Sequence, residues 1–118
     1  MANEEFKKAL DASREIELTV TARTSGREIS NPVWFVRDGE TLYLVPANGS
    51  DADWYKNALK TPTIRLAAGG TQLTASVTPI SDAGKVHQIL DRFRAKYSAQ
   101  SVEAYDPKQD AAVEVPIA

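Results

Sequence analysis

The sequence contains no cysteine and a single histidine, His87. Without cysteine the chain has no disulfides, no thiolate metal ligands and no thiol nucleophile. With only one histidine, a tight zinc or copper site is not expected, and we predict no metal site. A Ser-His-Asp hydrolase would depend on His87, which lies among polar residues of a predicted helix and is expected at the surface. Any catalysis is therefore expected to rely on a bound cofactor.

Nucleotide-binding signatures and long apolar segments are also missing. The chain has no Gly-x-Gly-x-x-Gly run and no phosphate loop in which Lys precedes Ser or Thr. No apolar run approaches the roughly 18 residues needed to span a bilayer. Residues 1–8 lack the apolar region of a signal peptide. We therefore expect a cytoplasmic protein with no membrane span.

The charge balance is slightly acidic. The chain has 14 Lys and Arg against 16 Asp and Glu, a net charge of −2 and a pI of about 5.4. The electrostatic field of a slightly acidic protein does not favour the binding of polyanions, so we expect no nucleic-acid partner. A chain of 118 residues with 42% hydrophobic and 25% charged residues suits one folded domain spanning residues 1–118.

Six segments have the composition of β-strands. Residues 15–23 alternate strictly between apolar and polar side chains, which indicates a half-buried strand. The pair Asp38-Gly39 separates two apolar segments and predicts a tight hairpin turn with Gly39 at positive φ. Residues 24–31 contain Gly26 and precede Pro32, which predicts a loop. The six predicted strands are residues 15–23, 33–37, 41–45, 63–67, 71–78 and 111–117.

One long helix and two short ones are predicted beside these strands. Residues 83–97 carry an apolar stripe at helical spacing behind a Ser81 or Asp82 cap. Residues 3–12 and 54–60 are the short helices, the second capped by Asp51 or Asp53. Short connections favour antiparallel pairing. The fold class is thus mainly β, or α+β, as a six-stranded, closed or partly open Greek-key barrel.

Two polar loops follow strands and are predicted to lie at the same end of the sheet. Glycines, hydroxyls, guanidinium groups and the amides at a helix start are what a phosphate group requires. We predict that the loops face each other across a cleft that holds a cofactor phosphate; ordinary turns with solvated arginines are the alternative. Loop one comprises Arg23, Thr24, Ser25, Gly26 and Arg27, and loop two comprises Asn48, Gly49 and Ser50, which lead into the helix of Trp54.

The segment from Arg23 to Gly39, RTSGREISNPVWFVRDG, resembles the N-terminal signature of the deazaflavin-dependent nitroreductase family. That family belongs to the pyridoxamine-phosphate-oxidase-like split barrels. The similarity continues through residues 47–50 and 54–57, then Leu59 and Pro62, and covers roughly residues 15–97. It implies a six-stranded split barrel that holds FMN or a deazaflavin of the coenzyme F420 type in a groove, with the phosphate near loop one.

The same resemblance implies an activity. The enzyme would be an oxidoreductase that transfers hydride from the reduced cofactor to a small electron-poor acceptor such as a quinone or a nitro compound.

Related barrels often pair across the sheet, so a homodimer is expected.

This chain departs from the family pattern at three positions. Thr24, Ile29 and Asn48 stand where the deazaflavin users commonly carry basic residues. The anionic tail of a deazaflavin would lose these charge-assisted bonds. Three interpretations stay open: Arg23 and Arg27 compensate, the smaller FMN is preferred, or the cofactor has been lost. In the last case the protein is a non-catalytic split barrel that binds a ligand or a partner.

Four aromatic residues have more than one interpretation. Trp34 lies on the predicted hairpin and is interpreted equally well as core packing or as the wall of a ring-lined pocket. Tyr97 ends the long helix, where the resemblance implies a tyrosine near the substrate, and core capping explains it equally well. We predict that Trp34 and Tyr97 border the cofactor ring and the substrate. Tyr43 lies beside Trp34 on the predicted hairpin and has the same two interpretations. Trp54 heads the helix after loop two, either beside the cofactor or as a structural plug.

Overall fold

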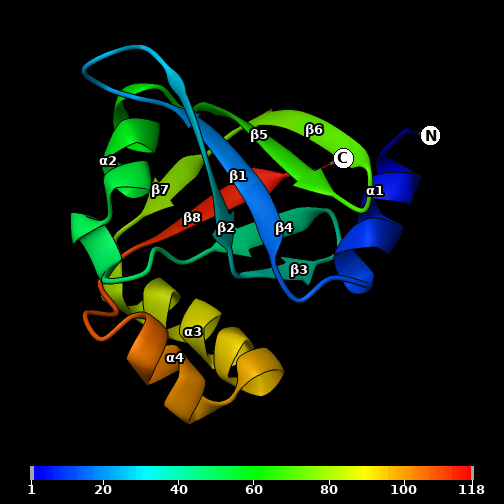
Figure 1. The fold of residues 1–118 in the computed structure, drawn as a ribbon. Helices are drawn as coiled ribbons and strands as arrows, with labels where there is room; N and C mark the ends of the chain where they lie inside the picture. The colour runs from blue at the N-terminus through cyan, green and yellow to red at the C-terminus, as the bar shows by residue number, and fades with distance from the viewer. Residues whose placement is uncertain (1, 118) are drawn as a thin grey trace.

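Two antiparallel four-stranded sheets form the body of the protein, whose computed structural model describes residues 2–117 (Figure 1). One sheet has the order β2-β1-β5-β6 and the other the order β3-β4-β8-β7. The strands of the first sheet are β1 (Ile16–Thr21), β2 (Glu28–Val33), β5 (Thr63–Ala68) and β6 (Thr71–Ser76). Those of the second are β3 (Phe35–Asp38), β4 (Thr41–Leu44), β7 (Thr78–Ile80) and β8 (Ala112–Pro116).

The helices surround these sheets. They are α1 (Ala2–Asp11), α2 (Asp53–Lys60), α3 (Ala83–Tyr97) and α4 (Ala99–Tyr105), with a 3-10 turn η1 (Gly49–Asp51) before α2. The predicted bounds of α3 are confirmed, and Asp82 caps it by accepting a hydrogen bond from the Lys85 amide at 2.9 Å. No helix among residues 2–117 combines the length and the apolar character needed to cross a membrane.

The α+β class and the antiparallel sheets are confirmed, but the count of six strands is wrong because the described residues form eight. Only the first half of the segment predicted as a loop, residues 24–27, is a loop, because residues 28–31 belong to β2, which pairs with β1 from Glu28 to Val33. The predicted strand 71–78 breaks at Val77, so β6 stays in the first sheet and β7 pairs with β8 in the second. The helix count is also corrected, since α4 forms in a stretch that was expected to be irregular.

The hairpin between β3 and β4 is confirmed with its turn shifted by one residue. Asp38 is the last strand residue and pairs with Thr41. The two residues of the turn are therefore Gly39 and Glu40 rather than Asp38 and Gly39. Gly39 has φ +61°, the left-handed conformation that glycine adopts without strain.

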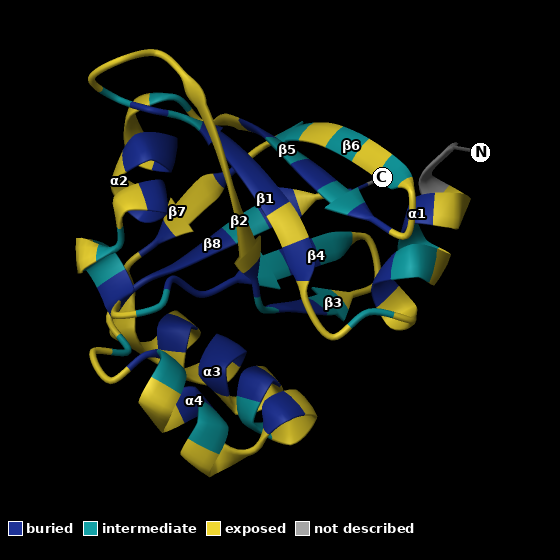
Figure 2. Ribbon diagram, in the orientation of Figure 1, coloured by how far each residue is buried: buried dark blue, intermediate teal, exposed yellow. Residues whose placement is uncertain are grey.

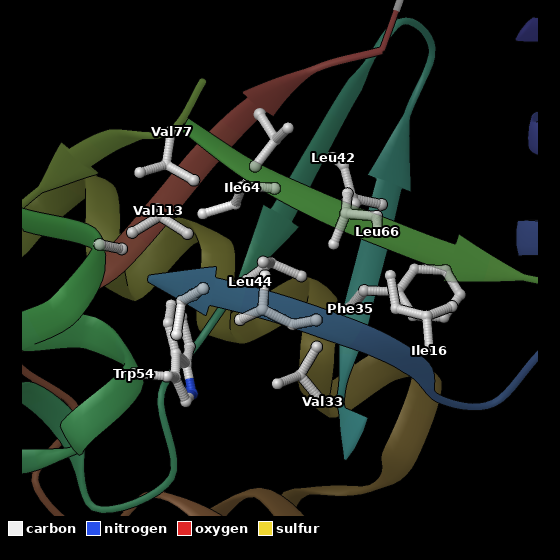
Figure 3. Close-up of a cluster of buried hydrophobic side chains, with 14 of the residues drawn as sticks. Ile16, Val33, Phe35, Leu42, Leu44, Trp54, Ile64, Leu66, Val77 and Val113 are labelled. Atoms are coloured by element: carbon white, nitrogen blue, oxygen red, sulfur yellow. The ribbon is translucent and has the colours of Figure 1, made fainter. Parts of the chain in front are cut away.

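The main core fills the space between the two sheets (Figures 2 and 3). Leu18, Leu44 and Leu66 meet there at 1% exposure or less. Phe6 and Leu10, both 1% exposed, dock α1 onto this core. A second cluster packs Val86, Ile89, Leu90, Phe93 and Tyr97 of α3 against the second sheet.

Candidate functional site

Loop one connects β1 to β2 at one end of the first sheet (Figure 1). The amide of Gly26 donates to the Ala22 carbonyl at 3.0 Å, and the amide of Ala22 donates to the Arg27 carbonyl at 2.7 Å. Gly26 has φ +74°, which closes this tight turn. Thr24, Ser25 and Arg27 are exposed. The loop thus presents two hydroxyl groups and a guanidinium to solvent.

Helix α2 holds the start of loop one in place. The Asn57 Oδ1 atom accepts hydrogen bonds from the Arg23 amide at 3.0 Å and from Arg23 Nη1 at 2.8 Å. Lys60 Nζ donates to the Arg23 carbonyl at 2.8 Å. Asp53 completes the set with a carboxylate oxygen 3.6 Å from Arg23 Nη2. Asn57 is 3% exposed, so this amide is a buried anchor for the loop.

A small pocket of about 220 Å³ lies between loop one and α2. Arg23 and Thr24 line it from the loop, Asp53 and Asn57 from the helix, and Ile29 from β2. It therefore combines a guanidinium, a hydroxyl and an apolar wall with one carboxylate.

Loop two packs against the segment that follows α4. The amide of Asn48 donates to the Tyr105 carbonyl at 3.1 Å, and the amide of Gly49 to the Pro46 carbonyl at 3.0 Å. Asp110 accepts from the Ser50 amide at 2.9 Å and from the Ser50 hydroxyl at 2.6 Å. These bonds to Ser50, the hydroxyl first, lower the pKa of the Asp110 carboxyl. A carboxylate of the chain itself thus occupies the position where loop two was expected to receive a phosphate.

A second carboxyl lies close to loop two. Asp106 is fully buried, and its Oδ1 atom accepts from the Gln109 amide at 3.0 Å. Burial raises the pKa of this carboxyl. A Cβ built on Gly49 would lie 3.3 Å from Asp106 Oδ1. An anion at loop two would therefore meet two carboxyl groups, Asp106 and Asp110.

The two loops contact different parts of the molecule. Loop one lies against α2, whereas loop two lies against residues 105–110. No hydrogen bond or ion pair between residues 2–117 joins loop one to loop two. The common cleft predicted between them stays a prediction.

Trp34 and Tyr97 lie side by side, with Tyr105 on the other side of Trp34. The Trp34 ring is stacked 4.2 Å from the Tyr97 ring and 4.3 Å from the Tyr105 ring, with interplanar angles of 6° and 4°. The indole is therefore sandwiched, and both of its faces are covered by tyrosine rings.

Hydrogen bonds fix both tyrosines of this sandwich. The Tyr97 hydroxyl donates to the Arg14 carbonyl at 2.6 Å and accepts from the Phe35 amide at 3.2 Å. The Tyr105 hydroxyl accepts from the Trp34 amide at 3.4 Å. Burial raises the pKa of Tyr105 to about 12 and also raises that of Tyr97. Both hydroxyls therefore stay protonated at neutral pH.

Trp54 lies in the core, and His87 lies at the surface as expected. Trp54 is 8% exposed and extends from α2 into the main core (Figure 3). His87 is exposed on α3. Neither expected cap of α2 forms, because its N-cap is Ala52.

The two facing antiparallel sheets and their connections define the class of protein as a split β-barrel. A family model described as "Uncharacterized protein conserved in bacteria (DUF2255)" matches residues 7–115. The chain belongs to this DUF2255 family. Membership of the deazaflavin-dependent nitroreductase family stays a prediction from the motif resemblance.

Solved structures of several different proteins share this fold at low sequence identity. The F420-H2-dependent reductase FDR-A superposes with a TM-score of 0.68 at 17% identity, covering 86% of this chain and 93% of the reductase. A protein from Listeria innocua assigned as a pyridoxamine 5′-phosphate oxidase gives a TM-score of 0.71 at 12% identity, covering 98% and 92%. The heme storage protein HutZ from Vibrio cholerae gives 0.73 at 12% identity, covering 98% and 89%.

Three residues at these sites were not identified from the sequence. Asn57 anchors loop one, Asp110 binds loop two, and Tyr105 completes the aromatic sandwich. Asn57 lies within a motif that carries the family resemblance, which is a usable signal. Asp110 and Tyr105 lie in a stretch without regular patterning, so no local signal marks them.

Proposed function

We propose that this protein binds a flavin or deazaflavin cofactor through loop one and acts as an oxidoreductase on a small electron-poor acceptor. The bound cofactor would supply the hydride chemistry. The observation that carries the proposal is the arrangement of loop one, where exposed Arg27, Ser25 and Thr24 stand beside the pocket lined by Arg23. A guanidinium with neighbouring hydroxyls suits a phosphate group.

The residues of loop one fit an anion better than those of loop two. Among residues 2–117, no carboxylate pairs with the guanidinium of Arg27, so its donors remain available to a ligand. Asn57 orients the Arg23 guanidinium through a hydrogen bond, and the Asp53 carboxylate forms an ion pair with it. At loop two, a phosphate would have to displace Asp110 from Ser50. We therefore assign the phosphate contact to loop one. Asn48, Gly49 and Ser50 would contact the cofactor only where Asp110 gives up its bonds to Ser50.

Trp34 and Tyr97 would border the ring of the cofactor or the acceptor from the edge of the sandwich. Both faces of Trp34 are covered, so a ligand ring that stacked on it would have to displace Tyr105. The chain's own role would be to orient the ligand and to exclude water.

A second candidate is a split barrel that binds a ligand or partner without catalysis. Two observations favour it: the closed aromatic sandwich and the carboxylate of Asp110 at loop two. The absence of basic residues at the positions of Thr24, Ile29 and Asn48 agrees with these two observations.

A binding experiment with matched variants tests the proposal. Titration of FMN and of a deazaflavin is expected to give an affinity that Arg27→Ala lowers by about tenfold or more, because one charge-assisted hydrogen bond contributes roughly 1.5–3 kcal/mol. Lys85→Ala removes an exposed cation from the first turn of α3 and is the control. Equal affinities for Arg27→Ala and Lys85→Ala would remove Arg27 from the site.

A further inference from the structure

A second pocket lies between α1, β3 and α3 and has a volume of about 450 Å³. Leu10 of α1, Phe35 and Val36 of β3 and Ala95 of α3 form its apolar walls. Arg37, Arg92 and Lys96 line it as well, with Asp11 as the acidic residue. We call it the α1–β3–α3 pocket. It shares no lining residue with loop one or with the pocket beside that loop.

The three cations of this pocket differ in how far their charge is already neutralised. The charge of Arg37 is already neutralised by Asp11, because its Nε and Nη2 atoms donate to the two carboxylate oxygens at 3.0 and 2.8 Å. Its Nη1 atom donates to the Gly39 carbonyl at 2.8 Å. Arg92 has a solvent-exposed partner, Asp38, at 3.1 Å. Exposed ion pairs of this kind are weak, so Arg92 can turn toward a ligand at little cost.

Lys96 has no carboxylate partner among residues 2–117. Its Nζ atom lies 3.4 Å from the centroid of the Phe35 ring and donates to the Phe35 carbonyl at 2.9 Å. Phe35 is 1% exposed, so the ammonium group rests against a buried ring. Arg14 lies near the same tyrosine ring as Lys96. The guanidinium carbon of Arg14 and the Nζ atom of Lys96 are each 5.1 Å from the centroid of the Tyr97 ring.

The surroundings of Lys96 disfavour its charged form. Burial, followed by the positive charge of Arg14, lowers the pKa of Lys96 to about 8, against an opposing effect of Asp11. The remaining charged groups of the pocket are Arg37, which is neutralised by Asp11, and Arg92 on the same helix. A bound anion would relieve this unfavourable balance, because an opposite charge nearby stabilises the ammonium form.

We propose that the α1–β3–α3 pocket binds a small organic anion, an apolar body carrying one carboxylate or phosphate group, with Lys96 and Arg92 as its cationic partners. The apolar body would contact Leu10, Val36 and Ala95, and the anionic group would lie at Lys96 Nζ. The volume and the mixed walls agree with ordinary small-molecule sites, which are largely apolar with a few polar groups that fix orientation.

Three aromatic probes of similar size test the proposal. Benzoate and phenyl phosphate are expected to bind saturably and to shift the amide resonances of Val36, Ala95 and Lys96, whereas neutral benzyl alcohol binds at least about tenfold more weakly. A preference between the two anions identifies the carboxylate or the phosphate as the native group. Equal affinity for benzyl alcohol, or no saturable binding of either anion, would overturn the proposal.

Matched variants assign the effect to Lys96. We expect Lys96→Gln to weaken benzoate binding by about tenfold or more, Lys96→Arg to retain it, and Lys85→Gln, on the same helix but outside the pocket, to leave it unchanged. Benzoate affinity in the wild type should fall as the pH rises through about 8, and this dependence should be absent in Lys96→Arg. Equal binding by Lys96→Gln and Lys85→Gln would contradict the assignment.

Discussion

Tyr105 shows how burial couples one side chain to the stability of the whole protein. Because its pKa rises to about 12 in the folded state, the unfolded chain loses this proton near pH 10 while the folded chain retains it. The stabilising contribution is fully present below pH 10 and is lost as the pH rises toward 12. We expect the free energy of unfolding to fall by up to about 2 kcal/mol over that interval on account of Tyr105.

Chemical denaturation between pH 9 and pH 12 measures this effect. Tyr105→Phe retains the ring stacked on Trp34 and should show a shallower loss of stability with pH. Tyr43→Phe removes a hydroxyl from β4 and serves as the control. Identical pH slopes for the wild type and Tyr105→Phe would contradict the prediction.

Several site residues could be predicted by type, but their partners could not. Arg23 and Gly26 were recognisable from loop composition and from the family motif. The bonds of Arg23 to Asn57 and of Ser50 to Asp110 span 34 and 60 residues. Such pairs depend on how the barrel closes, so local sequence patterns do not reveal them.

Loop two and the segment after α4 form one packed unit, and Gly49 lies at its centre. Gly49 has φ +64°, and an added Cβ would lie 2.7 Å from Lys108 Cβ and also overlap Asp110 Oδ1. We expect Gly49→Ala to lower the free energy of unfolding by about 2–4 kcal/mol, through left-handed strain and this overlap.

Gly39 provides a matched control for Gly49. It has a similar φ, +61°, but nothing lies within 4 Å of its added Cβ. Gly39→Ala should therefore cost only about 1–2 kcal/mol. Thermal or denaturant unfolding of both variants checks the difference, and equal losses would mean that loop two is not packed against residues 106–110.

Strand β2 escaped prediction for a physical reason. Five of its six residues are exposed, so the apolar alternation that identifies a half-buried strand is missing. Pro32 also lies within it, and proline is tolerated because β2 is an edge strand. By contrast, the stripe of α3 was predictable because each of its apolar residues is buried on one face.

Strand β2, one of the two edge strands of the first sheet, suggests where copies of the chain meet. Among residues 2–117, β2 pairs with β1 alone, and Ile29 on it is 40% exposed. An unpaired edge carries free backbone donors and acceptors that favour pairing with another strand. We expect a homodimer that uses this edge.

Light scattering on a sizing column tests the dimer. The wild type should have twice the monomer mass of 12.9 kDa, and Ile29→Asp should shift it toward the monomer. Leu59→Asp alters the other large exposed apolar residue, which is 48% exposed on α2, and should leave the dimer intact. A monomeric wild type would contradict the expectation.

The barrel class was predictable because antiparallel hairpins and one amphipathic helix determine it. The number of strands was not, because the break at Val77 transfers the chain from one sheet to the other. That transfer depends on long-range pairing of β7 with β8, which the local sequence of residues 71–80 does not encode.

We propose above all that this split barrel binds a flavin-type cofactor. Fluorescence titration of the wild-type protein with a deazaflavin, and in parallel with FMN, tests it most directly. We predict saturable quenching of one of the two cofactors, with one molecule bound per chain. If neither fluorescence changes at protein concentrations well above the micromolar range, the cofactor proposal is contradicted and the non-catalytic split barrel takes its place.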